Sequence, residues 1–265
     1  MFTFTKILIP VALSPSCAWA AQYGVQMARR FDAELLFLHI GDCPRETVEA
    51  FLGPAVNDAQ YEIAICHGDP ADVIVQVARE TSPSMIVMPT HAHGRFRRFL
   101  LGSVTAKVLH DLDYPVLTGV HQETAPSPGR VDIHQIVGAV DANESFVPVT
   151  QGALELSALF NAALTLIHAV PAADETSDNR GEIELRKYLF HMAEGKFDRL
   201  KREAALDVTI SLAGGEVCTV VREATLRTGA ELVVIGRGQT QRALGRLRTH
   251  SYSIIRHSPC PVLSI

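Results

Sequence analysis

The sequence predicts an α/β fold made of two tandem open-sheet domains, each a mostly five-stranded parallel sheet with helices on both faces. Short, β-branched apolar runs alternate with longer amphipathic stretches along the 265 residues. Near-continuous apolar strands are typical of parallel sheets whose two faces are covered by helices. The whole pattern then occurs a second time, and a domain of about 100–200 residues fits twice into this length.

The first half contains five predicted strands and two well-marked helix starts. Ser14-Pro15 and Asp69-Pro70 each precede an amphipathic stretch, and a polar N-cap followed by proline is a typical helix beginning. The predicted strands share a run of apolar, mostly β-branched residues, and they cover residues 6–12, 34–40, 61–66, 84–88 and 114–118.

A linker separates the two copies. Residues 122–130 carry Pro126, Pro128 and Gly129, which disfavour both helix and strand. We therefore expect one domain over residues 1–123 and a second over 131–265.

Landmarks recur in the same order in both halves. The second half begins with an apolar run at residues 135–141, in which Asp141 falls opposite Ala12 of the first run. His168 falls opposite His39 at the same offset, and residues 260–263 repeat residues 114–117. Two copies of one α/β unit are the simplest explanation.

Composition excludes several classes of protein. The formal net charge is −5, and binding to nucleic acid or to an anionic membrane usually needs a basic surplus. No apolar run reaches the roughly 18 residues of a spanning helix, and no signal-peptide pattern begins the chain. The five cysteines lack CxxC spacing, which fits reduced thiols. We expect a soluble cytoplasmic protein without nucleic-acid or membrane partners.

The largest difference between the copies lies at residues 178–206, where a long charged helix replaces the short one predicted at residues 45–52. Apolar residues at helical spacing form a stripe along it. The stripe either packs on the sheet or binds an unknown protein partner.

Two loops after the fourth strands are candidate ligand loops. Residues 89–105 and 236–250 are rich in glycine, arginine and hydroxyl groups, and each leads into a helix. Ligands of open parallel sheets sit beyond the carboxyl ends of the strands, where helix N-termini favour phosphate. The alternative is a solvated loop whose charges only aid solubility.

Specific blocks in these regions carry a resemblance. Residues 86–91 read Ile-Val-Met-Pro-Thr-His, residues 100–105 read Leu-Leu-Gly-Ser-Val-Thr, and residues 260–263 read Cys-Pro-Val-Leu. With them the chain resembles a tandem member of the universal stress protein family over essentially its whole length. The resemblance implies strand order 3-2-1-4-5 in each domain, pseudo-symmetric packing like that of a family dimer, and an adenine nucleotide, ATP or AMP, as ligand.

The family's phosphate loop is Gly, two residues, Gly, nine residues, Gly, then Ser or Thr, and an aspartate at the end of the first strand holds the ribose. In the second domain Asp141 and Gly236 match this pattern. Gln239 replaces the second glycine, and Arg248 and Thr249 occupy the positions of the final Gly and Ser or Thr. The nucleotide-binding residues implied there are Asp141, Ala169, Gly236, Arg237, Gly238, Gln239, Arg248 and Thr249.

The first domain keeps less of the pattern. Ala12 replaces the ribose aspartate and Pro89 the first glycine, while Gly102 and Ser103 remain. A loop without the ribose acid can still hold a phosphate, a sulfate or a small acidic ligand. Its candidate anion-binding residues are Thr90, His91, Gly94, Arg95, Gly102 and Ser103. The alternative is that Ser103 only caps the following helix.

The function implied is that of a cytoplasmic stress-response protein that binds an adenine nucleotide as a sensor, mainly in the second domain. We predict no catalytic residues and at most slow ATP hydrolysis, because no nucleophile lies beside a base and no P-loop lysine occurs. His91 and His93 alone make no metal site. The rival hypotheses are a scaffold with two degenerate pockets and, last, an enzyme acting on an adenylated molecule. A homodimer is a further expectation.

Overall fold

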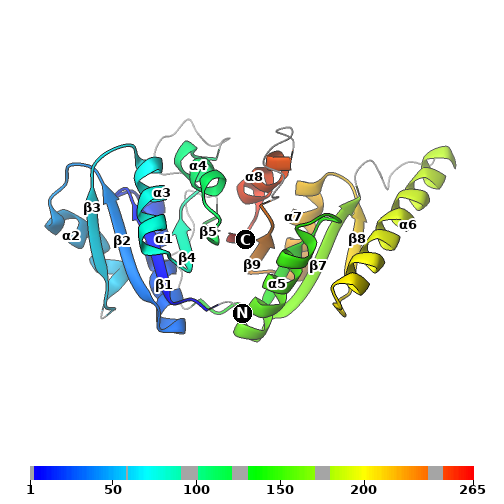
Figure 1. Ribbon diagram of the computed structural model, residues 1–265, viewed down its shortest axis with the longest axis horizontal. Helices are drawn as coiled ribbons and strands as arrows, with labels where there is room; N and C mark the ends of the chain where they lie inside the picture. Colours follow the sequence, from blue (N-terminus) through cyan, green and yellow to red (C-terminus); the bar gives the residue numbers. More distant parts are fainter. Residues whose placement is uncertain (1–2, 58, 91–100, 121–130, 171–179, 238–246) are drawn as a thin grey trace. The chain divides into compact units, whose positions relative to one another are not determined.

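The computed structural model describes residues 3–57, 59–90, 101–120, 131–170, 180–237 and 247–265, with only the backbone described at 247–249. These residues form two compact units. The first comprises Met1–Asp132 with Pro261–Ser264, and the second comprises Ile133–Cys260 with Ile265. Each unit is an open α/β sheet (Figure 1).

The first unit alternates strands and helices. In chain order it contains β1 (Lys6–Val11), α1 (Pro15–Phe31), β2 (Glu34–Ile40), α2 (Arg45–Val56), β3 (Glu62–Cys66), α3 (Pro70–Thr81), β4 (Met85–Met88), α4 (Ser103–Asp111) and β5 (Val116–Thr118).

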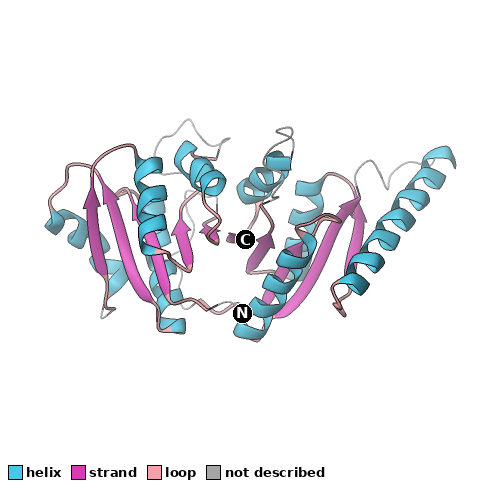
Figure 2. Ribbon diagram, viewed as in Figure 1, coloured by secondary structure: helices cyan, strands magenta, loops and turns pink. Residues whose placement is uncertain are grey.

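The strand order of the first unit is β3-β2-β1-β4-β5, with parallel pairing throughout. The strand β10 (Val262–Ser264) adds to this unit and runs antiparallel to β5. Every residue of β4 is buried, as a strand covered on both faces requires. Helices lie on both faces of the sheet (Figure 2).

The second unit repeats this arrangement. It contains β6 (Gln135–Ala139), α5 (Phe146–Phe160), β7 (Ala163–Val170), α6 (Arg180–Glu203), β8 (Ile210–Gly214), α7 (Val217–Thr228), β9 (Leu232–Ile235) and α8 (Leu247–His257). Its strand order is β8-β7-β6-β9, all parallel. Ile265, just after β10, exchanges backbone hydrogen bonds with Ile235 and Arg237. The predicted fold of two tandem open-sheet domains is confirmed.

The predicted helix starts are also confirmed. Ser14 is the N-cap of α1, where its side chain accepts from the Cys17 N–H, and Pro15 follows at the first turn. The Asp69 carboxylate accepts the N–H groups of Ala71 and Asp72 at the start of α3. Both caps satisfy N–H groups that have no partner within the helix.

The helix α6 packs on the sheet over a shorter length than the predicted apolar stripe suggests. Of its 24 residues only Ala193 and Phe197 are buried. Of the predicted stripe, Leu185 and Met192 are exposed, by 51% and 43%. Tyr188, outside the stripe, is exposed by 59%. The N-terminal end of α6 extends beyond the sheet (Figure 1).

Candidate functional site

A pocket of about 430 Å³ opens at the carboxyl ends of the strands of the second unit. Its walls come from the strand ends of β6, β7 and β9, the turn before α5, and the helices α6, α7 and α8. The lining residues are Ala139, Val140, Asp141, Ala142, Asn143, Ser145, Ile167, His168, Ala169, Val170, Leu189, Met192, Ala193, Lys196, Val217, Val221, Ile235, Gly236, His250, Ser251 and Ile254. This is the position at which open parallel sheets bind ligands.

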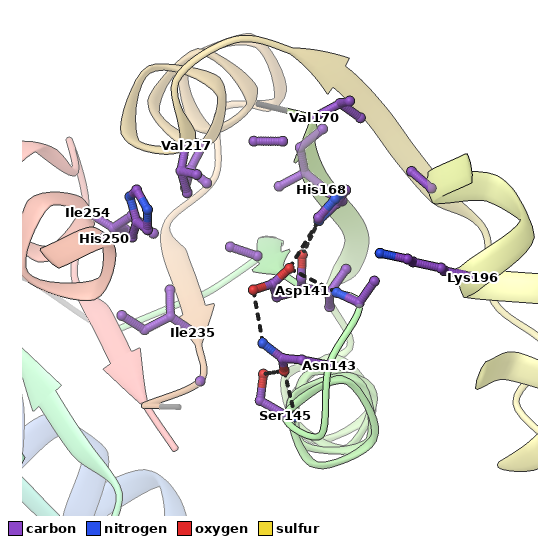
Figure 3. A pocket seen from close by; sticks show the side chains of 18 of the residues that line it. Asp141, Asn143, Ser145, His168, Val170, Lys196, Val217, Ile235, His250 and Ile254 are labelled. Carbon is purple, nitrogen blue, oxygen red and sulfur yellow. Dashed lines mark hydrogen bonds and ion pairs between the residues drawn. The ribbon is translucent and has the colours of Figure 1, made fainter. Parts of the chain in front are cut away.

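Asp141 projects into this pocket from a tightly bonded turn (Figure 3). Its Oδ1 accepts the Ala142 N–H at 2.9 Å, and its Oδ2 accepts the Asn143 side-chain amide at 2.9 Å. Asn143 Oδ1 in turn accepts the backbone N–H and the hydroxyl of Ser145, at 2.8 and 2.7 Å. The carboxylate is thus held in place while its side chain stays 55% exposed.

His168 ties the end of β7 to the end of β6. Its Nδ1 lies 2.9 Å from the Val140 carbonyl oxygen and 3.8 Å from Asp141 Oδ1. The ring meets Phe197 of α6 edge-on, with centroids 4.9 Å apart. With Nδ1 donating to the carbonyl, the ring fixes the wall of the pocket beside Asp141.

Gly236 follows β9 and lies against the start of α5. A Cβ at this position would stand 2.7 Å from Val149 Cγ2 and 3.2 Å from Ser145 Cβ, so a side chain there would displace the Val149 methyl group. Packing alone therefore favours this glycine. Its carbonyl accepts the Ser251 hydroxyl at 3.2 Å, which ties β9 to α8.

The start of α7 completes the upper wall. Burial alone would raise the pKa of Glu216, but N–H groups of Cys218 and Thr219 donate to its carboxylate, and the net pKa lies below the ordinary value. Glu216 is the N-cap of α7 and accepts the Thr219 N–H at 3.0 Å. Its negative charge occupies this helix N-terminus, so an anionic ligand group is favoured elsewhere in the pocket.

The structure brings three of the eight residues predicted for this site together. Asp141, Ala169 and Gly236 line the pocket. Arg237 is described, and its backbone N–H donates to the Ile265 carbonyl. Arg248 and Thr249 belong to the first turn of α8, where only the backbone is described. Gly238 and Gln239 lie outside the described residues.

Sequence reasoning missed the other polar lining residues. Asn143 and Ser145 follow Asp141 at a spacing typical of an Asx turn, and that signal was available. His250 is the last residue of the predicted loop at 236–250, but it was not among the predicted binding residues. Lys196 enters the pocket from α6, and only the path of that helix across the sheet places it there.

In the first unit the predicted anion loop is described only at its two ends. Thr90 is buried, and its carbonyl accepts the Gly102 N–H at 2.9 Å, so this amide already has a partner. His91, Gly94 and Arg95 lie outside the described residues. Whether this loop holds an anion stays a prediction.

The alternative reading of Ser103 as a helix cap is wrong. Gly102 is the N-cap of α4, with no side-chain hydrogen bond, and Ser103 is the first helical residue. The α4 helix is held instead by Thr105, whose hydroxyl donates to the Pro89 carbonyl at 3.0 Å.

Other chemistries find no support in the described part of the chain. No cluster of three or more His, Cys, Asp or Glu side chains suited to a metal occurs there. Among the described helices, none combines the length and apolar character needed to cross a bilayer. All five cysteines are free, and burial raises the pKa of the Cys218 thiol, which keeps it protonated at neutral pH.

Comparison with known proteins places these features in a family. The sequence profile of the universal stress protein family matches residues 54–118 and 132–265. The universal stress protein Slr1230 of Synechocystis is 28% identical over 124 residues, which are 44% of this chain and 42% of that protein. The match thus spans less than half the length of this relative.

Solved structures share the fold along the chain. A functionally unknown protein from Pseudomonas aeruginosa aligns over 99% of this chain and 92% of its own, with TM-score 0.68 and 14% identity. A universal stress protein from Archaeoglobus fulgidus aligns over 99% and 96%, with TM-score 0.65 and 20% identity. Since the family profile matches in both halves and covers most of the sequence, the chain belongs to the universal stress protein family.

Proposed function

We propose that the pocket of the second unit binds an adenine nucleotide, ATP or AMP, and that the protein acts through this site as a cytoplasmic sensor in the stress response. The choice of adenine and of a sensor follows from the family. The choice of this pocket follows from the chemistry of its residues.

The observation that carries the proposal is the hydrogen-bonding state of Asp141. Each carboxylate oxygen accepts one bond from its own turn, to Ala142 N–H and to Asn143 Nδ2. An ionised carboxylate offers about four acceptor sites, so each oxygen keeps one for a ligand. Two neighbouring acceptors at a fixed position suit the vicinal hydroxyls of a ribose.

The remainder of the pocket fits a nucleoside. Its volume of about 430 Å³ is in the range of small-molecule sites. Apolar side chains supply walls against which a planar base can lie, namely Ile167, Val170, Val217, Val221, Ile235 and Ile254. Asn143, Ser145 and His168 are polar groups close to Asp141, whereas Lys196, His250 and Ser251 come from α6 and α8. A few polar groups among apolar walls are typical of a site in which they fix the orientation of a ligand.

The test is titration of the purified chain with ATP and AMP by calorimetry, with Asp141→Ala as the variant. Loss of a charged acceptor costs about 1.5–3 kcal/mol, so we expect affinity to fall by about tenfold or more. Asp207→Ala is the matched control, because Asp207 is exposed and does not line the pocket. Unchanged affinity in a folded Asp141→Ala protein would reject the assignment.

The rival function is a scaffold that binds no nucleotide. Nucleotide copurification separates the two, since a bound adenylate absorbs near the nucleobase band once the protein is denatured. A homodimer and a protein partner on α6 remain proposals. Oligomeric state in solution, measured for the wild type and for Tyr188→Glu on the exposed face of α6, tests whether that face takes part.

A further inference from the structure

The strand order of the second unit gives its pocket two distinct ends. The strands lie side by side as β8-β7-β6-β9, and Asp141 follows β6. On one side of Asp141, β9 leads into the predicted phosphate loop, whereas β7 and the helix α6 that packs on it lie on the other side. A nucleotide whose ribose meets Asp141 and whose phosphates lie at that loop therefore directs its base toward β7 and α6.

The helix α6 lines this second end with apolar side chains. Leu189, Met192 and Ala193 reach the cavity from α6. Their spacing of three and four residues places them on one face of the helix. Ala193 packs against Val170 of β7, and Leu189 packs on the same two residues. One face of α6 thus closes the pocket beyond the end of β7.

Met192 differs from the other apolar lining residues in its exposure. It is 43% exposed, whereas Val170, Ile235 and Ile254 are exposed by 4%, 2% and 5%. Among the described lining residues it is the one exposed apolar side chain. A ligand gains apolar contact by removing surface from water, and a side chain that is already buried offers little such surface. Met192 therefore has the largest exposed fraction left for a base to cover.

The wall that carries Met192 is held at a fixed place relative to Asp141. Phe197, farther along α6, is 2% exposed and packs against His168 and Phe146, with centroids 4.9 and 5.4 Å away. His168 Nδ1 in turn lies 3.8 Å from Asp141 Oδ1 (Figure 3). A binding residue needs this kind of support from its neighbours to discriminate between ligands. The thioether itself adapts to an aromatic ring and makes favourable sulfur–aromatic contacts.

We propose that Met192 is a specificity-determining residue of the pocket, whose thioether contacts the base at the α6 end and favours adenine over pyrimidines. A purine reaches farther from the ribose than a pyrimidine, because it carries a second ring. This inference rests on the proposed function, because it presupposes that an adenine nucleotide occupies the pocket.

The first measurement is the affinity of adenosine, AMP and CMP for the wild type, Met192→Ala and Met192→Leu. For Met192→Ala we expect adenosine and AMP to bind more weakly by the same factor, roughly two- to tenfold, because only the contact with the base is lost. CMP should lose less, so the preference for AMP over CMP should fall. Met192→Leu should retain most of that preference, since it conserves volume and apolar character.

The second measurement observes the contact directly. The chain has five methionines, and with ¹³C-labelled methyl groups the Met192 signal is the one absent from the spectrum of Met192→Leu. AMP should shift this signal through the ring current of the base. Ribose 5-phosphate, which has no ring system of this kind, should not. Met27, Met85 and Met88, which are buried in the first unit, serve as internal controls and should keep their positions.

Leu185→Ala is the matched control variant, because Leu185 is an exposed apolar residue of the same helix that does not line the pocket. It should leave all three affinities unchanged. A loss for AMP but not for adenosine, or an equal loss for CMP, would overturn the inference, since Met192 would then act on the phosphate or the sugar. An unmoved Met192 signal in a protein that binds AMP by calorimetry would overturn it while leaving the proposed function intact. A wild type that binds no adenylate would reject the proposed function itself, and this inference with it.

Discussion

The two units keep the same internal hydrogen bonds at the carboxyl ends of their strands. His39 Nδ1 lies 3.0 Å from the Val11 carbonyl, just as His168 Nδ1 lies 2.9 Å from that of Val140. The fourth strands match as well. Thr105 donates to the Pro89 carbonyl in the first unit, and Ser251 donates to the Gly236 carbonyl in the second. These bonds belong to the fold, because both copies have them.

The groups available to a ligand differ between the copies. At the end of β1 the Ala12 N–H donates to Cys17 Sγ, and no carboxylate stands there. At the equivalent place Asp141 presents two oxygens to the pocket. The second copy also carries the long α6 in place of the short α2. The two units thus keep the same fold while the chemical groups at the ends of their strands differ. The following experiments test whether the shared bonds and the differing groups have separate roles.

The largest effect is expected for Phe197→Ala. Phe197 is 2% exposed and one of only two buried side chains of α6. Truncation of a buried Phe costs about 3–5 kcal/mol, so unfolding of the second unit should begin at lower urea concentration. Leu185→Ala, on the exposed face of the same helix, is the control and should change little. Equal effects of the two variants would show that α6 is not anchored through Phe197.

The paired substitutions His39→Leu and His168→Leu address the shared bond directly. Each leaves a backbone carbonyl without its donor, which typically costs about 1–3 kcal/mol. We expect similar losses of thermal stability in the two variants. Nucleotide affinity, measured by calorimetry, should fall only for His168→Leu, because only this ring stands beside Asp141. A fall for His39→Leu as well would break the comparison.

The smallest effect is expected at the α7 cap. Because the folded-state pKa of Glu216 lies below its ordinary value of 4.5, its ionised form stabilises the native state above that value. This contribution is lost as pH falls through the lower, folded pKa. Glu216→Gln should therefore lower the melting temperature at pH 7, and this difference should be smaller at a pH well below 4.5. A difference that is the same at both pH values would contradict this sign.

Local signals in the sequence predicted the fold well. The strand β2 has the bounds expected from its apolar run, and the Ser14 and Asp69 caps lie where a polar residue precedes proline. Each of these depends on neighbouring residues alone. Ser103 shows the limit, because the helix begins one residue earlier than its hydroxyl would suggest, and Gly102 takes the cap position.

The candidate site was predictable only in part. The resemblance to the universal stress protein family pointed to Asp141, and counting along the internal repeat placed Ala12 at the equivalent position of the first copy. Lys196 could not be found in this way. Its position depends on how α6 crosses the sheet, and helical periodicity in the sequence does not predict that crossing. Periodicity also overstated the burial of α6, because the sheet covers only the part around Ala193 and Phe197.

The close approach of Gly236 to α5 affects how the history of such a chain can be read. A Cβ at this residue would stand 2.7 Å from the Val149 side chain, so close packing favours the glycine whether or not a ligand binds. A sequence search that takes Gly236 as a sign of nucleotide binding could therefore be detecting a residue kept for the packing of the fold. Asp141 is the better marker, since its side chain is 55% exposed and is not subject to the close packing found at Gly236.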